Sequence, residues 1–391
     1  MTRRLYFVAG EPSGDLIGRE VMDAIRARTP NLLYRSTGGT FMAECAPSSG
    51  LDTRPLAVLG FWEGIKAYRD VVRLADKTAD DILTFQPDAV VLIDSWGFTL
   101  RVAQRVRARA PDIRLIKLIG PQVWATRPGR AKTLAETIDH LLCLHEFEVP
   151  FYEPFDLKTT VIGNPALSRL DKVDGAAFRT RHALADGTPI IAVFPGSRVS
   201  EIDRIAPHLM QAAAVLSRRV AGATVFAAPA ASVSDRFVDL FADDMGTSFE
   251  LCEEAERSEL MAAARVALAC SGTVTTEIAV QGTPLVTGYR TGAVTWALAK
   301  YLLMRAEFIT LLNVSAGRMI VPERLQHEFN ARALANDAEL LLTDDAVHDA
   351  QVAAQSEALR SMGYGDMPAA EIAAEAILKD LSEMAEATPS D

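Results

Sequence analysis

The sequence of 391 residues has no long hydrophobic run, because no uninterrupted apolar stretch exceeds five residues. A helix that crosses a bilayer needs about 20 apolar residues. The apolar stretch after Arg3 and Arg4 is also too short for the core of a signal peptide. We therefore expect a protein that is soluble or lies on a membrane surface.

The sequence also lacks clustered cysteines and any excess of positive charge. Its four cysteines are far apart, and its six histidines show no metal-binding spacing, so we assign no metal, no disulfide framework and no cofactor. The formal net charge of −11 argues against nucleic acid as the main partner. These features fit a cytoplasmic protein that acts on other ligands.

Apolar stretches and helical periodicity alternate along the first part of the chain, a pattern typical of a parallel α/β sheet. The stretches of strand type lie at Leu5–Ala9, Ala89–Ile93, Ile113–Ile119 and His140–Leu144. After a polar stretch, Ser168–Gly187, the alternation begins again with "IIAVF". We expect two α/β domains, residues 1–167 and 168–365, that face a central cleft, and a C-terminal helix at about 366–391 that packs back on the first domain.

Two loops of the second domain are candidates for a nucleotide site. "FPGSR" contains Gly196, Ser197 and Arg198, and "CSGTVTTE" contains a small-residue turn followed by Glu277. Backbone amides at such turns can bind a diphosphate, and a carboxylate can bind ribose hydroxyls. The alternative is that Ser271 and Thr273 only cap a helix.

Two features of the first domain also suggest chemistry. "LYFVAGEPSGDLIG" leads from a buried strand into a loop whose amides could face an anion, although its glycine spacing is not that of a dinucleotide fingerprint. Asp94 ends the strand in "VVLID", where it could act as a general base or only cap the next helix.

The apolar residues Phe61, Trp62, Ile65 and Tyr68 recur at helical spacing in "GFWEGIKAYRDVV". Such a stripe is either the core-facing side of a helix or a surface that contacts lipid. Periodicity alone favours the core.

Taken together, the motifs resemble those of the lipid-A-disaccharide synthase family. Its members are inverting glycosyltransferases of the GT-B fold. The matching strings include "AGEPSGDLIG", "LAVLGFWEG", "PQVWATRPGRAKTL", "IGNP", "FPGSRVSEI", "SGTVTTE", "GYR" and "LLNVSAGR". They follow the family's order over nearly the whole chain. The resemblance implies transfer of diacylglucosamine from UDP-2,3-diacylglucosamine to 2,3-diacylglucosamine 1-phosphate, which releases UDP and gives the lipid A disaccharide 1-phosphate.

The resemblance also implies roles for individual residues. Asp94 and Arg198 are the implied catalytic residues. The UDP-sugar site would comprise Gly196, Ser197, Arg198, Ser271, Gly272, Thr273, Glu277, Tyr289, Arg290 and Asn313. The acceptor side would comprise Gly10, Glu11, Ser13 and Gly14. Phe61, Trp62, Ile65 and Tyr68 would take acyl chains or rest on the inner membrane, with which the protein would associate peripherally. The oligomeric state stays open, with a homo-oligomer among the alternatives.

The chain departs from the family pattern at several positions. Gly97 replaces a second acid, which leaves Asp94 as the acid at this strand end, and Asn164 stands where a histidine is frequent. Two other functions stay open: a UDP-sugar epimerase of the same fold, which needs no acyl-binding surface, and a noncatalytic binding protein, which needs no base.

Overall fold

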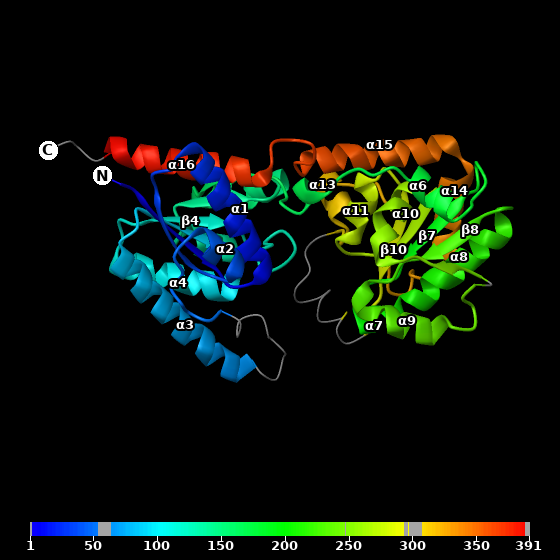
Figure 1. The fold of residues 1–391 in the computed structure, drawn as a ribbon, viewed down its shortest axis with the longest axis horizontal. Helices are drawn as coiled ribbons and strands as arrows, with labels where there is room; N and C mark the ends of the chain where they lie inside the picture. Colours follow the sequence, from blue (N-terminus) through cyan, green and yellow to red (C-terminus); the bar gives the residue numbers. More distant parts are fainter. Residues whose placement is uncertain (1, 54–63, 247, 293–295, 297–306, 388–391) are drawn as a thin grey trace. The chain divides into compact units, whose positions relative to one another are not determined.

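The computed structural model describes residues 2–53, 64–246, 248–292, 296 and 307–387. The chain forms two compact units, residues 1–168 with 365–391, and residues 169–364. Each unit contains a six-stranded parallel sheet covered by helices (Figure 1). The expected α/β class, with two Rossmann-like domains, is confirmed.

The sheet of the first unit has the order β2-β1-β3-β4-β5-β6. Its strands are β1 (Arg4–Ala9), β2 (Leu33–Thr37), β3 (Ala89–Ile93), β4 (Arg114–Leu118), β5 (His140–Cys143) and β6 (Lys158–Val161). Its helices are α1 (Pro12–Arg28), α2 (Thr40–Cys45), α3 (Gly64–Phe85), α4 (Trp96–Arg109), α5 (Arg130–Ala135) and α16 (Ala369–Ala387). The strand order reverses direction between β1 and β3, which is where ligands bind in sheets of this type.

Both faces of this sheet are covered, which explains why its strands are continuous apolar runs rather than alternating ones. All five residues of β3 are buried. One face packs against α1 and α16, and the other against α3 and α4. Glycine at position 18 allows α1 to lie close to the sheet, since a Cβ atom there would be 2.8 Å from Cδ1 of Ile93.

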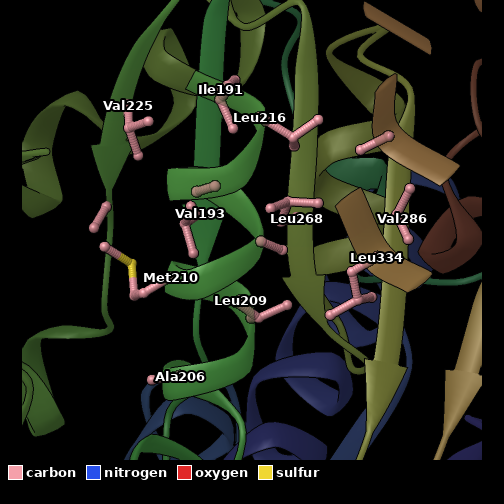
Figure 2. Close-up of a cluster of buried hydrophobic side chains, with 14 of the residues drawn as sticks. Ile191, Val193, Ala206, Leu209, Met210, Leu216, Val225, Leu268, Val286 and Leu334 are labelled. Carbon is pink, nitrogen blue, oxygen red and sulfur yellow. The ribbon is translucent and has the colours of Figure 1, made fainter. Parts of the chain in front are cut away.

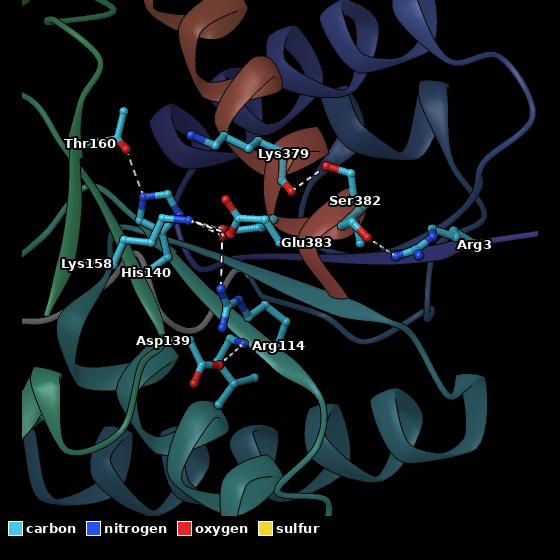
Figure 3. A network of polar contacts seen from close by, with 12 residues as sticks. Arg3, Arg114, Asp139, His140, Lys158, Thr160, Lys379, Ser382 and Glu383 are labelled. Carbon is cyan, nitrogen blue, oxygen red and sulfur yellow. Dashed lines mark hydrogen bonds and ion pairs between the residues drawn. The ribbon is translucent and has the colours of Figure 1, made fainter. Parts of the chain in front are cut away.

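Helix α16 comes from the end of the chain and is fixed to the first unit by a polar network (Figure 3). Its Asp380 is fully buried and accepts hydrogen bonds from Nδ1 of His140 at 2.7 Å and Nζ of Lys158 at 2.8 Å. Arg114 approaches the same carboxylate at 3.4 Å. Helix α16 is therefore tied to β4, β5 and β6.

The sheet of the second unit has the order β12-β11-β10-β7-β8-β9. Its strands are β7 (Ile190–Phe194), β8 (Thr224–Ala227), β9 (Glu250–Leu251), β10 (Val266–Cys270), β11 (Leu285–Tyr289) and β12 (Glu323–Leu325). Its helices are α6 (Ala176–Arg181), α7 (Val199–Arg204), α8 (Ala206–Arg219), α9 (Ser234–Phe241), α10 (Arg257–Ala263), α11 (Val274–Val280), α13 (Leu311–Ala316), α14 (Ala331–Thr343) and α15 (Asp345–Ser361). Here the strand order reverses between β7 and β10.

The core of the second unit lies between this sheet and helices α8 and α14 (Figure 2). Val193 and Leu268 of the central strands face Leu209 of α8 and Leu334 of α14, and all four are fully buried. Because β7 and β10 are held between packed layers, the loops that follow them start from fixed positions.

Among the described residues, no helix combines the length and the apolar character that a membrane crossing requires.

Candidate functional site

A cavity of about 430 Å³ opens at the carboxyl ends of β7 and β10, at the point where the strand order of the second unit reverses. Seven residues proposed from the sequence line it: Gly196, Ser197, Arg198, Ser271, Gly272, Thr273 and Glu277. The two loops that lie 75 positions apart in the sequence, counted from Gly196 to Ser271, therefore form one site. The fold brings them together because β7 and β10 are neighbouring strands.

The loop after β7 turns sharply at Gly196, whose φ of +123° is a conformation that L side chains rarely adopt. A Cβ atom at this position would lie 2.7 Å from Cβ of Glu201. Glu201, which is almost completely buried, accepts hydrogen bonds from the amides of Ser197 at 2.9 Å and Arg198 at 3.3 Å. Its carboxylate thus holds the loop in shape.

The guanidinium of Arg198 is available to a ligand. Its side chain is 73% exposed, although Nη1 also donates to Oε1 of Glu201 at 3.0 Å. The hydroxyl of Tyr289 lies 3.5 Å from the same carboxylate oxygen. Burial, followed by the charge of Glu201, raises the pKa of Tyr289, so this side chain stays a neutral donor.

On the other side of the cavity, the start of α11 has no side-chain cap. Thr273 is the N-cap residue but makes no capping hydrogen bond. The hydroxyls of Thr275 and Thr276 instead donate backwards to the carbonyls of Gly272 and Thr273, both at 2.7 Å. The alternative that Ser271 and Thr273 are present only as helix caps is therefore not supported by the capping geometry.

The cavity is also lined by three charged residues that the sequence motifs did not predict: Glu201, Glu254 and Arg257. Nη1 of Arg257 donates to the carbonyl of Ala228 at 3.0 Å, and its guanidinium lies 5.1 Å from the ring centre of Phe194. Glu201 stands three residues after the N-cap of α7, but that N-cap is Arg198, so the usual capping signature is absent from the sequence. No local signal marks Glu254 or Arg257.

Three predicted nucleotide ligands, Tyr289, Arg290 and Asn313, lie outside the group that lines the cavity. Arg290 is exposed, and its Nη1 lies 2.6 Å from Nε2 of His208. Asn313 is fully buried, accepts from the amides of Ile320 and Val321, and donates to Val321 and Glu323.

Asn313 nevertheless has an indirect connection with the cavity. Glu323 accepts hydrogen bonds from both Asn313 and the amide of Thr310, at 3.4 and 2.8 Å respectively. The Thr310 hydroxyl lies 3.5 Å from that of Ser271. This chain of contacts fixes the segment beside the small-residue turn.

In the first unit, Asp94 and Glu11 follow β3 and β1, at the reversal of the strand order. Partial desolvation, followed by the charge of Asp94, raises the pKa of Glu11. Asp94 and Ser95 both have positive φ values, +41° and +43°. Consecutive non-glycine residues in this conformation are strained, and such strain is concentrated at functional sites.

The predicted acceptor loop divides into exposed and buried residues. Glu11 and Ser13 are exposed, whereas Gly10 and Gly14 are buried. A Cβ atom on Gly14 would lie 3.4 Å from Cγ2 of Ile93, so packing against the sheet accounts for this glycine. The neighbouring Asp15 is structural, since its carboxylate accepts from three amides at the start of α2.

The remaining predictions concern the proposed lipid contact. Phe61 and Trp62 lie outside the described residues, and only the backbone of Ile65 and Tyr68, at the start of α3, is described. Within the described part of the chain, no group of three His, Cys, Asp or Glu side chains is arranged to hold a metal ion.

Comparison with known proteins relates nearly the whole chain to one family. Residues 5–377 match the family model described as Lipid-A-disaccharide synthetase. The lipid-A-disaccharide synthase of Rhodospirillum centenum is 34% identical over 97% of this chain and 95% of its own length. That of Paramagnetospirillum magneticum is 34% identical over 96% of both chains.

Solved structures show the same fold at low identity. The Staphylococcus aureus MnaA structure with UDP has a TM-score of 0.60 at 12% identity and covers 100% of both chains. A glycosyltransferase from Rickettsia africae has a TM-score of 0.55 at 12% identity, covering 99% of this chain and 100% of its own. At this identity the likeness concerns the fold alone.

Proposed function

Because the chain belongs to the lipid-A-disaccharide synthase family, we propose that it is the glycosyltransferase that forms the lipid A disaccharide. Its donor is UDP-2,3-diacylglucosamine, and its acceptor is 2,3-diacylglucosamine 1-phosphate. The products are UDP and the lipid A disaccharide 1-phosphate. The observation that carries this proposal within the structure is the cavity at the β7 and β10 loops, which gathers seven residues expected to bind the UDP-sugar.

The cavity has the chemistry that a nucleoside diphosphate requires. Arg198 supplies an exposed positive charge for the diphosphate, and the backbone amides of Gly272 and Thr273 supply uncharged donors. Glu277 supplies acceptors for the ribose hydroxyls. Arg198 also stabilises the negative charge that develops on the diphosphate as the glycosidic bond breaks.

Asp94 is the proposed general base. Its carboxylate takes the proton of the acceptor hydroxyl, and the oxygen then forms a bond to the anomeric carbon of the donor. The bond from that carbon to the diphosphate oxygen breaks, and its electron pair leaves on UDP. Because the attack is a direct displacement, the configuration at the anomeric carbon inverts.

Changing Asp94 to Asn tests the base directly. We expect Asp94→Asn to lower turnover by about two to four orders of magnitude, while UDP binding by the other unit stays unchanged. Asp112→Asn is the matched control, since Asp112 is exposed in the connection between α4 and β4. Near-normal turnover of Asp94→Asn would remove this residue from the mechanism.

The activity itself is tested by measuring UDP release with each lipid substrate omitted in turn, and by identifying the lipid product by mass. Release that requires both substrates and yields a disaccharide supports the transferase. Release from the UDP-sugar alone would indicate a hydrolase or epimerase. Absence of release together with UDP binding would indicate a noncatalytic binding protein.

We also place the acceptor on the first unit, near Glu11 and Ser13, and the protein at the inner-membrane surface. The diacyl substrates and the apolar sequence stripe that includes Phe61 and Trp62 support this assignment. A homo-oligomer is compatible with this placement of the acceptor and of the protein.

A further inference from the structure

Lys117 is a buried cation that the mechanism described above does not use. It lies in β4, where the neighbouring residues Ile116 and Leu118 belong to the apolar core. Only 2% of Lys117 is exposed. Burial of an ammonium group costs several kcal/mol unless nearby groups compensate it, so the position of this side chain needs an explanation.

The contacts of Lys117 all lead to the turn that presents Asp94. Its Nζ donates to the backbone carbonyl of Asp94 and, at 2.8 Å, to the hydroxyl of Thr99 in α4. That hydroxyl lies 2.6 Å from the same carbonyl. On the other side of the residue, the amide of Asp94 donates to the carbonyl of Leu118 at 2.9 Å. The peptide groups on both sides of Asp94 are thus held by β4 and α4.

The turn needs this support because of its backbone conformation. Asp94 and Ser95 both have positive φ values, a strained conformation for non-glycine residues that persists only when the surroundings enforce it. The protonated Lys117 amine is a strong hydrogen-bond donor to the Asp94 carbonyl, at the point where the chain turns.

The electrostatic setting agrees with this geometry. Burial lowers the pKa of Lys117 to about 7, and the negative charge of Asp94 opposes that lowering. Glu11 follows β1, the strand next to β3, and its pKa is raised by desolvation and then by the charge of Asp94. The protonated form of Lys117 therefore places a positive charge beside the Asp94 turn, and the charge of Asp94 favours that form.

We propose that Lys117 is a positioning residue for the glycosyl transfer: it fixes the strained Asp94–Ser95 turn so that the Asp94 carboxylate is held where it can take the acceptor proton. Lys117 itself touches neither substrate. This inference rests on the proposed function, in which Asp94 is the base.

The first test is Lys117→Met, which keeps the length of the side chain and removes its charge. We expect kcat to fall about 10- to 100-fold, with the KM for the UDP-sugar and the affinity for UDP unchanged. The melting temperature should stay the same or rise, because an apolar side chain suits a buried position better than an ammonium group. Lys132→Met is the control, since the Lys132 side chain is 65% exposed on α5.

The second test combines this change with Asp94→Asn. If Lys117 acts through Asp94, Lys117→Met will cause no further loss of kcat in the Asp94→Asn background, because groups that act as a unit are not additive. An equal loss in both backgrounds, or normal kcat for Lys117→Met alone, would overturn the inference. Normal kcat for Asp94→Asn would instead overturn the proposed base, so the two failures are distinguishable.

If Lys117→Met does not fold, two variants of Thr99 provide the test instead. Thr99→Val removes the hydroxyl that contacts both Nζ of Lys117 and the Asp94 carbonyl, whereas Thr99→Ser keeps it. We expect a lower kcat for the valine variant and recovery in the serine variant, again with unchanged UDP affinity. Equal kcat values in both variants would contradict the support of the turn by this cluster.

Discussion

At the scale of single residues, we expect the proposed donor site to depend on Arg198. Its guanidinium is exposed and belongs to the loop after β7, where it can reach a diphosphate in the cavity. A charge-assisted hydrogen bond contributes about 1.5–3 kcal/mol. Arg198→Ala should therefore weaken UDP binding by about 10- to 100-fold and also lower kcat, because the leaving diphosphate loses its countercharge. Calorimetric titration with UDP and steady-state kinetics measure the two effects.

The control for this change is Arg332→Ala, which removes an exposed arginine of α14 that does not line the cavity. It should leave both UDP affinity and kcat unchanged. If Arg198→Ala behaved like the control, Arg198 would have no part in donor binding or in the departure of UDP.

Some site residues could be predicted from local sequence motifs, whereas others take their places through the packing of distant segments. Gly196 and Ser271 lie in short motifs directly after apolar strands, so their place at a strand end follows from local pattern. Arg257 reaches the cavity from the start of α10, and Lys117 reaches Asp94 from a neighbouring strand. Such positions follow from strand order and packing, which local pattern does not specify.

At the scale of elements, α16 is held to the first unit by the buried carboxylate of Asp380. Burial opposes its ionisation, but the hydrogen bonds from His140 and Lys158 and the nearby charge of Arg114 prevail and lower its pKa from 3.8 to about 2. A lowered pKa stabilises the folded state at pH values above 3.8, and this contribution is lost as the pH falls towards 2. Its size is about 2 kcal/mol.

Asp380→Asn tests this contribution. At pH 7 we expect a loss of about 3 kcal/mol, because the cations around the carboxylate lose their partner, and the difference from the wild type should shrink by about 2 kcal/mol as the pH approaches 2. Urea unfolding at several pH values gives these differences. Glu383→Gln is the control, since this exposed residue also pairs with Lys158; a difference from wild type that does not depend on pH would contradict the role of Asp380.

The strand pattern of the elements was predictable because both sheets are buried on both faces, which makes runs such as "AVVLI" and "IIAVF" continuous and apolar. The lipid-facing interpretation of the Phe61–Tyr68 stripe stays a prediction, because periodicity alone does not distinguish a core face from a lipid-binding face.

At the scale of the whole molecule, the cavity assigned to the donor is built entirely from the second unit. UDP alone should therefore protect the cavity-lining loops of the second unit and not the first unit. At a concentration 100 times its dissociation constant, a ligand stabilises the state that binds it by about 2.7 kcal/mol. Hydrogen exchange followed by mass spectrometry on the full chain should show slower exchange at 195–204 and 270–280 with UDP, and little change at 9–18 and 92–99.

A second exchange experiment adds the acceptor to the UDP complex. Adding 2,3-diacylglucosamine 1-phosphate to the UDP complex should slow exchange at 9–18 and 92–99, where Glu11 and Asp94 stand at the reversal of the first sheet. Residues 345–361 in α15 serve as the internal control, because no residue of this helix lines the cavity. Equal protection of both units by UDP alone would mean that the nucleotide contacts both. Protection of the first unit alone would move the donor site away from the β7 and β10 loops.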